Sequence, residues 1–506
     1  MNGAPPVLAS NRLIARNSLL NLTGLVGPMV VAFVAIPILI SGLGTDRYGV
    51  LMYAWALVGY FSLLDLGLGQ ALTQVVAERL GGNRAGEIPT YAWTALLLMA
   101  GLGALGGLAL AGLTPFLVHH AFKIPASLQP ETLSALYLLA LSLPIVISSA
   151  GLRGVLEANQ NFGIVNAIRM PMGALSFLAP VMVLPFSHSL RDIIGALVAL
   201  RVVGWGLHLG FCLRKLPVLR HGVVFDRTVV FALARYGGWL SASNVANTFL
   251  VYLDRFLIGA LLSMAAVAHY VTPYEAVIKL WTIPGALLGV FFPAIAASFT
   301  IDRHRVAVLF DRAVRSIFLL VFPASFAIAM LAHLVLQLWV GPEFALHSTR
   351  VMQWMAVGVF INCLGMVPSA GLQGVGRPDL TGKLNLIELP LYVGMLWWLL
   401  TTKGIEGAAM AWVIRAGFDT LVLFAMAERV LPIGAYLRER LLVFLVPATL
   451  LIAAGMLNWT VTAQLILVLV VWATFPVVAW QMVLTDRERY RIKRLLIRDH
   501  VVLPTS

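Results

Sequence analysis

Apolar segments of about twenty residues recur along almost the whole chain, and they limit its fold more than any other feature. The chain has 506 residues, of which 60% are hydrophobic and 11% are charged. A soluble domain carries roughly 25% charged residues, so this chain cannot hide its apolar surface from water. Lipid must therefore be the solvent of these segments. The sequence predicts an all-α polytopic membrane protein.

We predict about fourteen membrane spans, six in each of two halves and two more at the end. The first half has spans near 18–41, 50–76, 90–117, 132–153, 164–186 and 192–213. The second half has spans near 238–262, 267–296, 313–337, 351–373, 383–402 and 405–427. The last two spans lie near 439–457 and 461–484. The first apolar run is too long for the core of a signal peptide, so we read it as an uncleaved span.

An internal repeat supports this division into halves. Residues 149–155 read SAGLRGV, and residues 369–375 read SAGLQGV. Shorter correspondences align Leu43-Gly44-Thr45 with Leu261-Leu262-Ser263, and Gly195-Ala196 with Gly407-Ala408. Duplicated halves in a membrane protein indicate a transporter whose site lies between the halves. The expected domains are an N-lobe over 1–215, a C-lobe over 216–430, and two further helices with a basic tail over 431–506.

The connections between the predicted spans alternate between many and few lysine and arginine residues. If the N-terminus is cytoplasmic, the inside connections near 214–235 and 298–315, together with the tail, hold most of them. The outside connections hold few: Arg47, Lys123, Arg191, Arg350 and Lys403. This bias predicts a multi-pass protein with both termini in the cytoplasm. The net charge of +13 does not indicate nucleic-acid binding, because the basic residues fall between apolar spans.

Ionisable side chains within the spans are the candidates for function. Each costs roughly 2.5–3.5 kcal/mol at the centre of a membrane helix, so such groups rarely face lipid. They are Asp65, Arg201, Asp254, Arg255, Glu275, Lys279, Glu388, Arg415 and Asp419. Arg201 and Arg415 lie near the middle of corresponding spans of the two halves. Two guanidinium groups facing one cavity could hold a diphosphate bidentately, or each could pair internally and brace the bundle. Asp419, four residues after Arg415, offers such a pair.

The carboxylates in the spans are candidates for proton or ion coupling, namely Asp65, Asp254 and Glu275. Asp65 lies alone in its span, where it could carry a proton or cap a break in the backbone. Glu275 precedes Lys279 by four residues, which favours a structural pair. The same pair could instead bind a substrate phosphate and a proton.

Uncharged polar residues extend this set. Asn244 and Asn247 precede Asp254 on a polar stripe that could line water or join helices. His208 shares a helical face with Arg201, from which it is seven residues distant. We expect Asn244, Asn247, His208 and Asp419 to line a polar cavity.

We find no metal-binding or nucleotide-binding motif above chance. The glycine-rich stretch Gly101–Gly107 lies inside an apolar span and contains no lysine, so it predicts close helix packing rather than a phosphate loop. We therefore expect no cofactor and no metal site, and energy from an ion gradient or from the substrate gradient. We also expect no enzymatic activity, because a glycan ligase or polymerase needs a sizeable outside loop with catalytic residues.

The most specific motifs lie in the first two spans. They are RNSLLNLTG and PILISGLGTDRYGVLMYAWALVGYFSLLDLGLGQALTQ, of which the LGT-x-x-YG segment followed by FSLLDLGLG is the most specific part. This stretch resembles the start of the polysaccharide-biosynthesis flippases, members of the multidrug/oligosaccharidyl-lipid/polysaccharide superfamily. The resemblance implies a MATE-like fold with two six-helix lobes around a V-shaped cavity, the last two spans outside, and alternating access.

The resemblance also implies a function. The expected substrate is the undecaprenyl-diphosphate-linked oligosaccharide of an O-antigen or exopolysaccharide pathway, flipped across the bacterial inner membrane. Arg201, Arg255, Lys279 and Arg415 are the candidate contacts of the diphosphate. Membrane lipid is an expected partner, and a glycan polymerase and a chain-length regulator are candidate partners. A drug/cation antiporter of the same superfamily and a membrane glycan ligase or polymerase are the alternatives.

Overall fold

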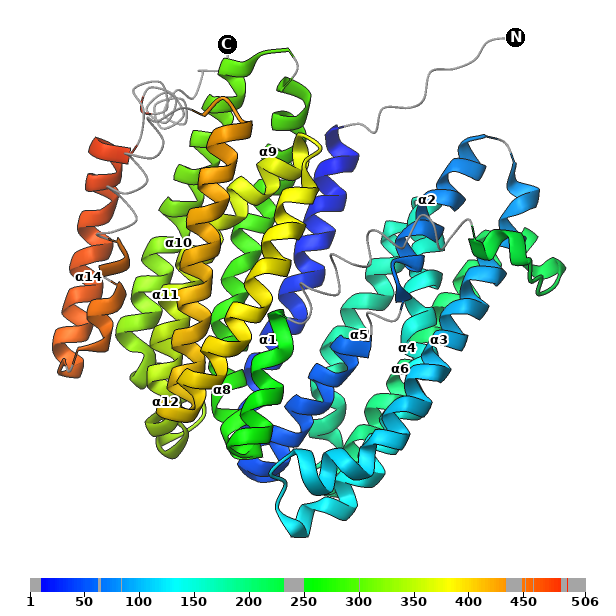
Figure 1. Ribbon diagram of the computed structural model, residues 1–506, viewed down its shortest axis with the longest axis horizontal. Coiled ribbons are helices and arrows are strands. Elements are labelled where there is room, and N and C mark those ends of the chain that lie inside the picture. The colour runs from blue at the N-terminus through cyan, green and yellow to red at the C-terminus, as the bar shows by residue number, and fades with distance from the viewer. Residues whose placement is uncertain are drawn as a thin grey trace, which may run out of the picture. The chain divides into compact units, whose positions relative to one another are not determined.

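All of the regular secondary structure that the computed structural model describes is helical. The described residues are 11–61, 65–82, 84–231, 250–299, 301–433, 448–450, 452–457, 459–483 and 489, and none of them lies in a strand. Ten helical stretches among them are long and apolar enough to cross a membrane. The predicted all-α polytopic architecture is confirmed (Figure 1).

The chain divides into two compact units, residues 1–269 and residues 270–506. The helices of the first unit are α1 (Asn11–Phe61), α2 (Leu68–Gly81), α3 (Ile88–Phe116), α4 (Gln129–Ala158), α5 (Phe162–Val183), α6 (Leu190–Lys215) and a helix that includes 250–261. Within this unit α4 packs on α2, α3 and α6, while α1 packs on α5 (Figure 1). The helix 250–261 joins this unit because Phe256 packs edge-on against Tyr53, with ring centroids 4.7 Å apart.

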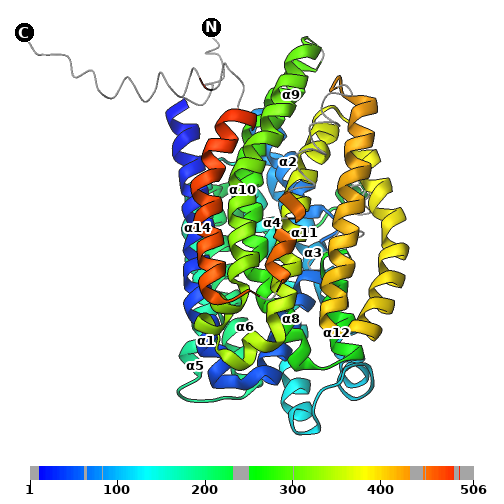
Figure 2. The ribbon, with the colours of Figure 1, turned by 90° about the vertical axis from the view of Figure 1, so that its left-hand side faces the viewer.

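The second unit is built around α11. Its helices are α8 (Met264–Val277), which begins just before the unit boundary, α9 (Thr282–Ser298), α10 (Arg303–Trp339), α11 (Pro342–Gly374), α12 (Pro378–Val430) and α14 (Val461–Val478). α11 packs on α10 and α12, and α14 lies beside α10 (Figure 2). Trp472 of α14 fixes this contact, because its Nε1 donates to the carbonyl of Pro323 at 3.2 Å.

Two helices are too long to cross a bilayer once. α1 has 51 residues and α12 has 53. At 1.5 Å per residue each would extend about 75–80 Å, against a hydrocarbon core of about 30 Å. Gly44 breaks α1 with a φ of 77°, and Gly404 breaks α12 with a φ of 62°, a backbone region that favours glycine. α12 therefore contains both of the spans that the sequence predicts near 383–402 and 405–427.

The repeated motif occupies equivalent helices of the two units. SAGLRGV lies toward the end of α4, and SAGLQGV lies at the end of α11. α4 packs on α3 and α6, as α11 packs on α10 and α12. This shared pattern of neighbours is what a duplicated half requires. The lobe boundaries near residues 215 and 430 remain predictions.

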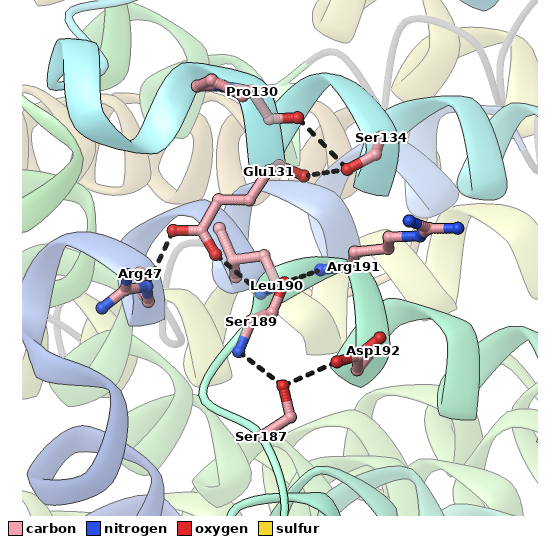
Figure 3. Close-up of polar contacts among 9 residues, drawn as sticks. All are labelled: Arg47, Pro130, Glu131, Ser134, Ser187, Ser189, Leu190, Arg191 and Asp192. Atoms are coloured by element: carbon pink, nitrogen blue, oxygen red, sulfur yellow. Dashed lines mark hydrogen bonds and ion pairs between the residues drawn. The ribbon is translucent and has the colours of Figure 1, made fainter.

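One carboxylate joins three helices at one end of the first unit. Oε1 of Glu131, at the start of α4, lies 2.8 Å from Nε of Arg47 in α1. Oε2 of Glu131 accepts a hydrogen bond from the backbone N–H of Leu190, at the start of α6, at 3.1 Å. A carboxylate at a helix N-terminus also has a favourable interaction with the helix dipole. Figure 3 shows this Glu131 junction, in which Ser187 Oγ also donates to Asp192 at 2.6 Å.

The glycine-rich stretch of α3 serves close packing, as the sequence predicts. A Cβ on Gly103 would lie 2.5 Å from Cα of Pro144, and one on Gly107 would lie 2.5 Å from the carbonyl oxygen of Ala140. Both contacts are to the backbone of α4. A Cβ on Gly101 would meet open space. Small residues let membrane helices approach closely enough for dispersion forces to hold them.

We therefore predict opposite outcomes for two alanine substitutions on α3. Gly103→Ala should destabilise the protein by about 1–3 kcal/mol, because the methyl group must push α3 away from the α4 backbone. Gly101→Ala should leave stability unchanged or slightly raise it. Thermal melting of the purified protein in detergent compares the two. Equal melting temperatures for both variants would contradict the close contact of α3 with α4.

Candidate functional site

Arg201 lies near the middle of α6 and has no compensating acid among the residues that the structure describes. Its side chain is half-buried, and its Nη1 is buried without a hydrogen-bond partner among the described residues. A buried donor left unpaired costs about 1–3 kcal/mol, so a structural role alone would not favour this arrangement. The guanidinium group retains its capacity for a bidentate bond to a phosphate.

His208 lies two turns further along α6 and is only partly satisfied. Its Nδ1 lies 2.7 Å from the carbonyl oxygen of Gly204, and its Nε2 is buried without a partner in the described part of the chain. Arg153 of α4 is close enough to interact electrostatically with both His208 and Asp65. Arg153 itself lies 3.7 Å from Glu157. Arg153 is the one position at which SAGLRGV differs from SAGLQGV. This difference in charge between the two repeats could have identified Arg153 as a candidate from the sequence.

Asp65 supports a break in the backbone, one of the two roles that the sequence allows. Its Oδ1 accepts a hydrogen bond from the N–H of Gly67 at 2.8 Å, just before α2 begins. Leu66 and Gly67 both have positive φ values, 47° and 71°. The carboxylate therefore accepts a hydrogen bond from the Gly67 N–H, which has no carbonyl partner within α2.

Asp254 and Arg255 lie together on the helix 250–261 and are both buried, with exposures of 1% and 5%. Oδ1 of Asp254 accepts a hydrogen bond from the backbone N–H of Arg255 at 2.7 Å. The Arg255 guanidinium lies 4.9 Å from the centre of the Tyr252 ring, a cation–π distance. Tyr60 of α1 interacts electrostatically with both residues. The stripe residues Asn244 and Asn247 lie outside the described residues.

Glu275 and Lys279 form the pair that their spacing favours. Nζ of Lys279 donates to Oε2 of Glu275 at 3.1 Å. Glu275 lies in α8, and Lys279 lies in the short 3₁₀ turn Ile278–Trp281 that separates α8 from α9. The side chains are 35% and 41% exposed, so the protein does not enclose this pair.

Arg415 pairs with Glu388 across the bend of α12. Its Nη1 lies 3.8 Å from Oε2 of Glu388, and its guanidinium carbon lies 5.2 Å from the centre of the Tyr392 ring. Asp419 interacts electrostatically with both Glu388 and Arg415. We call Glu388, Tyr392, Arg415 and Asp419 the α12 cluster. The sequence offers Asp419 as the partner of Arg415; the ion pair that forms is with Glu388.

Glu388 is the residue that the sequence undervalues. Its exposure is 2%, and within the described residues neither of its carboxylate oxygens has a hydrogen bond. Glu388 and Arg415 lie on different arms of α12, so spacing along one helix could not reveal their contact. Of the four basic residues proposed for the diphosphate, Arg201 and Arg255 belong to the first unit, and Lys279 and Arg415 to the second.

Solved structures identify the class of fold. A multidrug resistance MATE family transporter of the MOP superfamily, in an inward-facing conformation, matches 81% of this chain and 97% of its own, with a TM-score of 0.70 and 16% identity. The protein is a multi-pass membrane protein with the fold of MOP-superfamily transporters.

Sequence comparison identifies the family. The family model described as "Polysaccharide biosynthesis protein" matches residues 14–299, and the chain belongs to this family. A Shigella flexneri protein named as an O-antigen transporter is 27% identical over 81% of this chain and 96% of its own. A Haloferax volcanii protein named as a low-salt glycan biosynthesis flippase, Agl15, is 22% identical over 38% of this chain and 40% of its own.

The hydrogen bond of Asp65 predicts how two substitutions differ. Asp65→Asn keeps an acceptor for the Gly67 N–H and should retain most of the stability. Asp65→Ala removes the acceptor and should cost about 0.5–2 kcal/mol. Thermal melting measures this difference, and transport gives the second readout. If Asp65→Asn stops transport at unchanged stability, the carboxylate carries a proton in addition to its structural role.

The ion pair of the α12 cluster predicts a rescue. Arg415→Ala should destabilise the protein by about 3–5 kcal/mol, because Glu388 loses its cation and must either stay charged in the interior or take up a proton. The double variant Arg415→Ala/Glu388→Ala should regain part of this loss, because both charges are gone. Melting temperatures and protein levels in the membrane measure the rescue. A double variant less stable than Arg415→Ala would contradict the pairing.

Proposed function

We propose that the protein is a flippase that moves an undecaprenyl-diphosphate-linked oligosaccharide from the cytoplasmic to the periplasmic side of the bacterial inner membrane. Membership of the polysaccharide biosynthesis family supports this proposal, as do the two relatives named as an O-antigen transporter and a glycan flippase. The fold of MOP-superfamily transporters supports alternating access. The substrate would be an O-antigen or exopolysaccharide repeat unit, which a polymerase then extends.

The single observation that carries this proposal is the unpaired guanidinium of Arg201. Arg415 has Glu388 at 3.8 Å, and Lys279 has Glu275 at 3.1 Å. Arg201 has no such acid among the described residues, although its Nη1 is buried. A diphosphate would supply the missing acceptors in a setting where charge-assisted bonds are strong. We therefore assign the first phosphate contact to Arg201, and later contacts to Arg255, Lys279 and Arg415.

Coupling to an ion gradient is the second part of the proposal. Buried carboxylates can take up and release protons during a transport cycle, and Asp254 has 1% exposure. Glu275 could exchange its bond to Lys279 for a proton when Lys279 meets a phosphate. Asp65 is the weaker candidate, because its Oδ1 already accepts the bond from Gly67.

A drug/cation antiporter is the second candidate function. The likeness to a MATE transporter favours it, as does the α12 cluster, which contains two acids and one base. A cationic drug would, however, be repelled by the unpaired Arg201. The choice between the two functions therefore depends on this residue.

We predict that Arg201→Ala abolishes surface glycan while the protein remains in the membrane at its normal level. The loss follows from removal of the phosphate contact, whereas stability should not fall, because no described acid is left unpaired. Arg191→Ala is the matched control, since Arg191 lies at the exposed start of the same helix. Glycan blots and membrane immunoblots of a gene-deletion strain carrying each variant measure both effects. Normal surface glycan with Arg201→Ala would overturn the assignment.

A further inference from the structure

The α12 cluster holds more negative charge than its guanidinium can neutralise. Glu388 and Asp419 are two carboxylates, and Arg415 is the cation that faces them. With both carboxylates and the guanidinium ionised the cluster has a net charge of −1, and the carboxylate of Glu388 is enclosed, with 2% exposure. Both oxygens of Glu388 lack a hydrogen bond within the described residues. Within the described part of the chain, Arg415 is the cation that allows this enclosed carboxylate to remain charged.

We propose that Glu388 is a proton-binding site whose occupancy is set by competition for Arg415. When an anionic phosphate takes the Arg415 guanidinium, Glu388 loses its cation and accepts one proton from water, which converts –COO⁻ to –COOH. When the phosphate leaves, Arg415 returns to Glu388 and the proton is released. This inference rests on the proposed function, because it requires a phosphorylated passenger.

The geometry allows this exchange. The Arg415 side chain is 13% exposed, against 2% for Glu388, so an anion can reach the guanidinium while the carboxylate stays enclosed. The ion pair distance of 3.8 Å exceeds the range of a hydrogen bond, which makes the pair easier to exchange. The ring of Tyr392, 5.2 Å from the guanidinium carbon, supports the cation during the exchange.

Among the described residues, neighbouring charges do not supply an alternative partner for Glu388. α11, which packs on α12, carries no acidic or basic residue from 351 to its end at Gly374. Tyr274 of α8 packs against Trp412 of α12, and the charges of that region, Glu275 and Lys279, bond to each other. Phe310 of α10 contacts Phe424, and the nearby Asp311 and Arg315 pair at 2.7 Å.

The proposal predicts a pH dependence with a definite sign. If one proton binds with the anion, affinity for the anion rises as pH falls, by up to tenfold for each unit of pH. Glu388→Gln has no carboxylate to protonate and no negative charge to compete for Arg415. It should therefore bind the anion more tightly than wild type at high pH, and should lose the dependence that Glu388 causes.

The experiment uses the full chain in lipid nanodiscs and farnesyl diphosphate as the probe. Affinity is measured across a pH series for wild type, Glu388→Gln and Asp379→Asn. Asp379→Asn is the matched control, because Asp379 lies in the first turn of α12 and forms an ion pair with Arg377, outside the α12 cluster. Titration of the probe itself affects all three proteins equally. Infrared difference spectra of wild type, which need no variant, test for a protonated carboxyl band when the probe is added.

The expected result is a steeper pH dependence in wild type and Asp379→Asn than in Glu388→Gln, with a carboxyl band that Glu388→Gln lacks. Equal pH dependence in all three proteins, or no carboxyl band in wild type, overturns the inference and leaves the proposed function standing. Failure of wild type to bind the probe at any pH overturns both. If Glu388→Gln does not fold, the wild-type spectrum alone decides, and Asp419→Asn should retain the band.

Discussion

The need to compensate charge inside a membrane helix governs most of this structure. An ionised side chain in hydrocarbon is costly, so each one must find a partner within the protein or face water. Glu275 has Lys279, Asp311 has Arg315, and Glu388 has Arg415. Asp65 instead accepts the N–H of Gly67. Against this background Arg201 is an exception, because it has a buried Nη1 without a partner and no acidic residue beside it among the described residues, and such an exception is expected where a ligand supplies the partner.

Close helix contact provides the frame that makes such pairing possible. In lipid no hydrophobic force drives helices together, so small residues must bring the backbones near enough for dispersion. Gly103 and Gly107 do this for α3 and α4, and Gly365 of α11 does it against Thr420 of α12, where a Cβ would lie 2.5 Å from the hydroxyl oxygen. This contact packs α11 against the arm of α12 that follows Gly404 and carries Arg415.

The helical architecture could be predicted from the sequence, whereas the pairing of charges could be predicted only in part. Apolar length, the SAGLRGV and SAGLQGV repeat, and the glycines of α3 each report a local property, and the structure confirms the helices that they predict. Glu275 and Lys279 also pair as their spacing indicates. Arg415 does not pair as spacing suggests, because the bend at Gly404 brings Glu388 from the other arm of α12. Contacts that depend on a bend have no periodic signature in the sequence. The polar stripe at Asn244 and Asn247 lies outside the described residues.

The Glu131 junction has a mechanical consequence for the first unit. Its two carboxylate oxygens are divided between Arg47, three residues past the bend of α1, and the first N–H of α6. A tilt of α6 away from α4 would break the bond to Leu190, and a shift of the α1 bend away from α4 would break the bond to Arg47, whereas a displacement of all three helices together would break neither. The starts of α4 and α6 and the bend of α1 are therefore expected to move as one rigid block, so that any hinge within this unit must lie elsewhere along these helices.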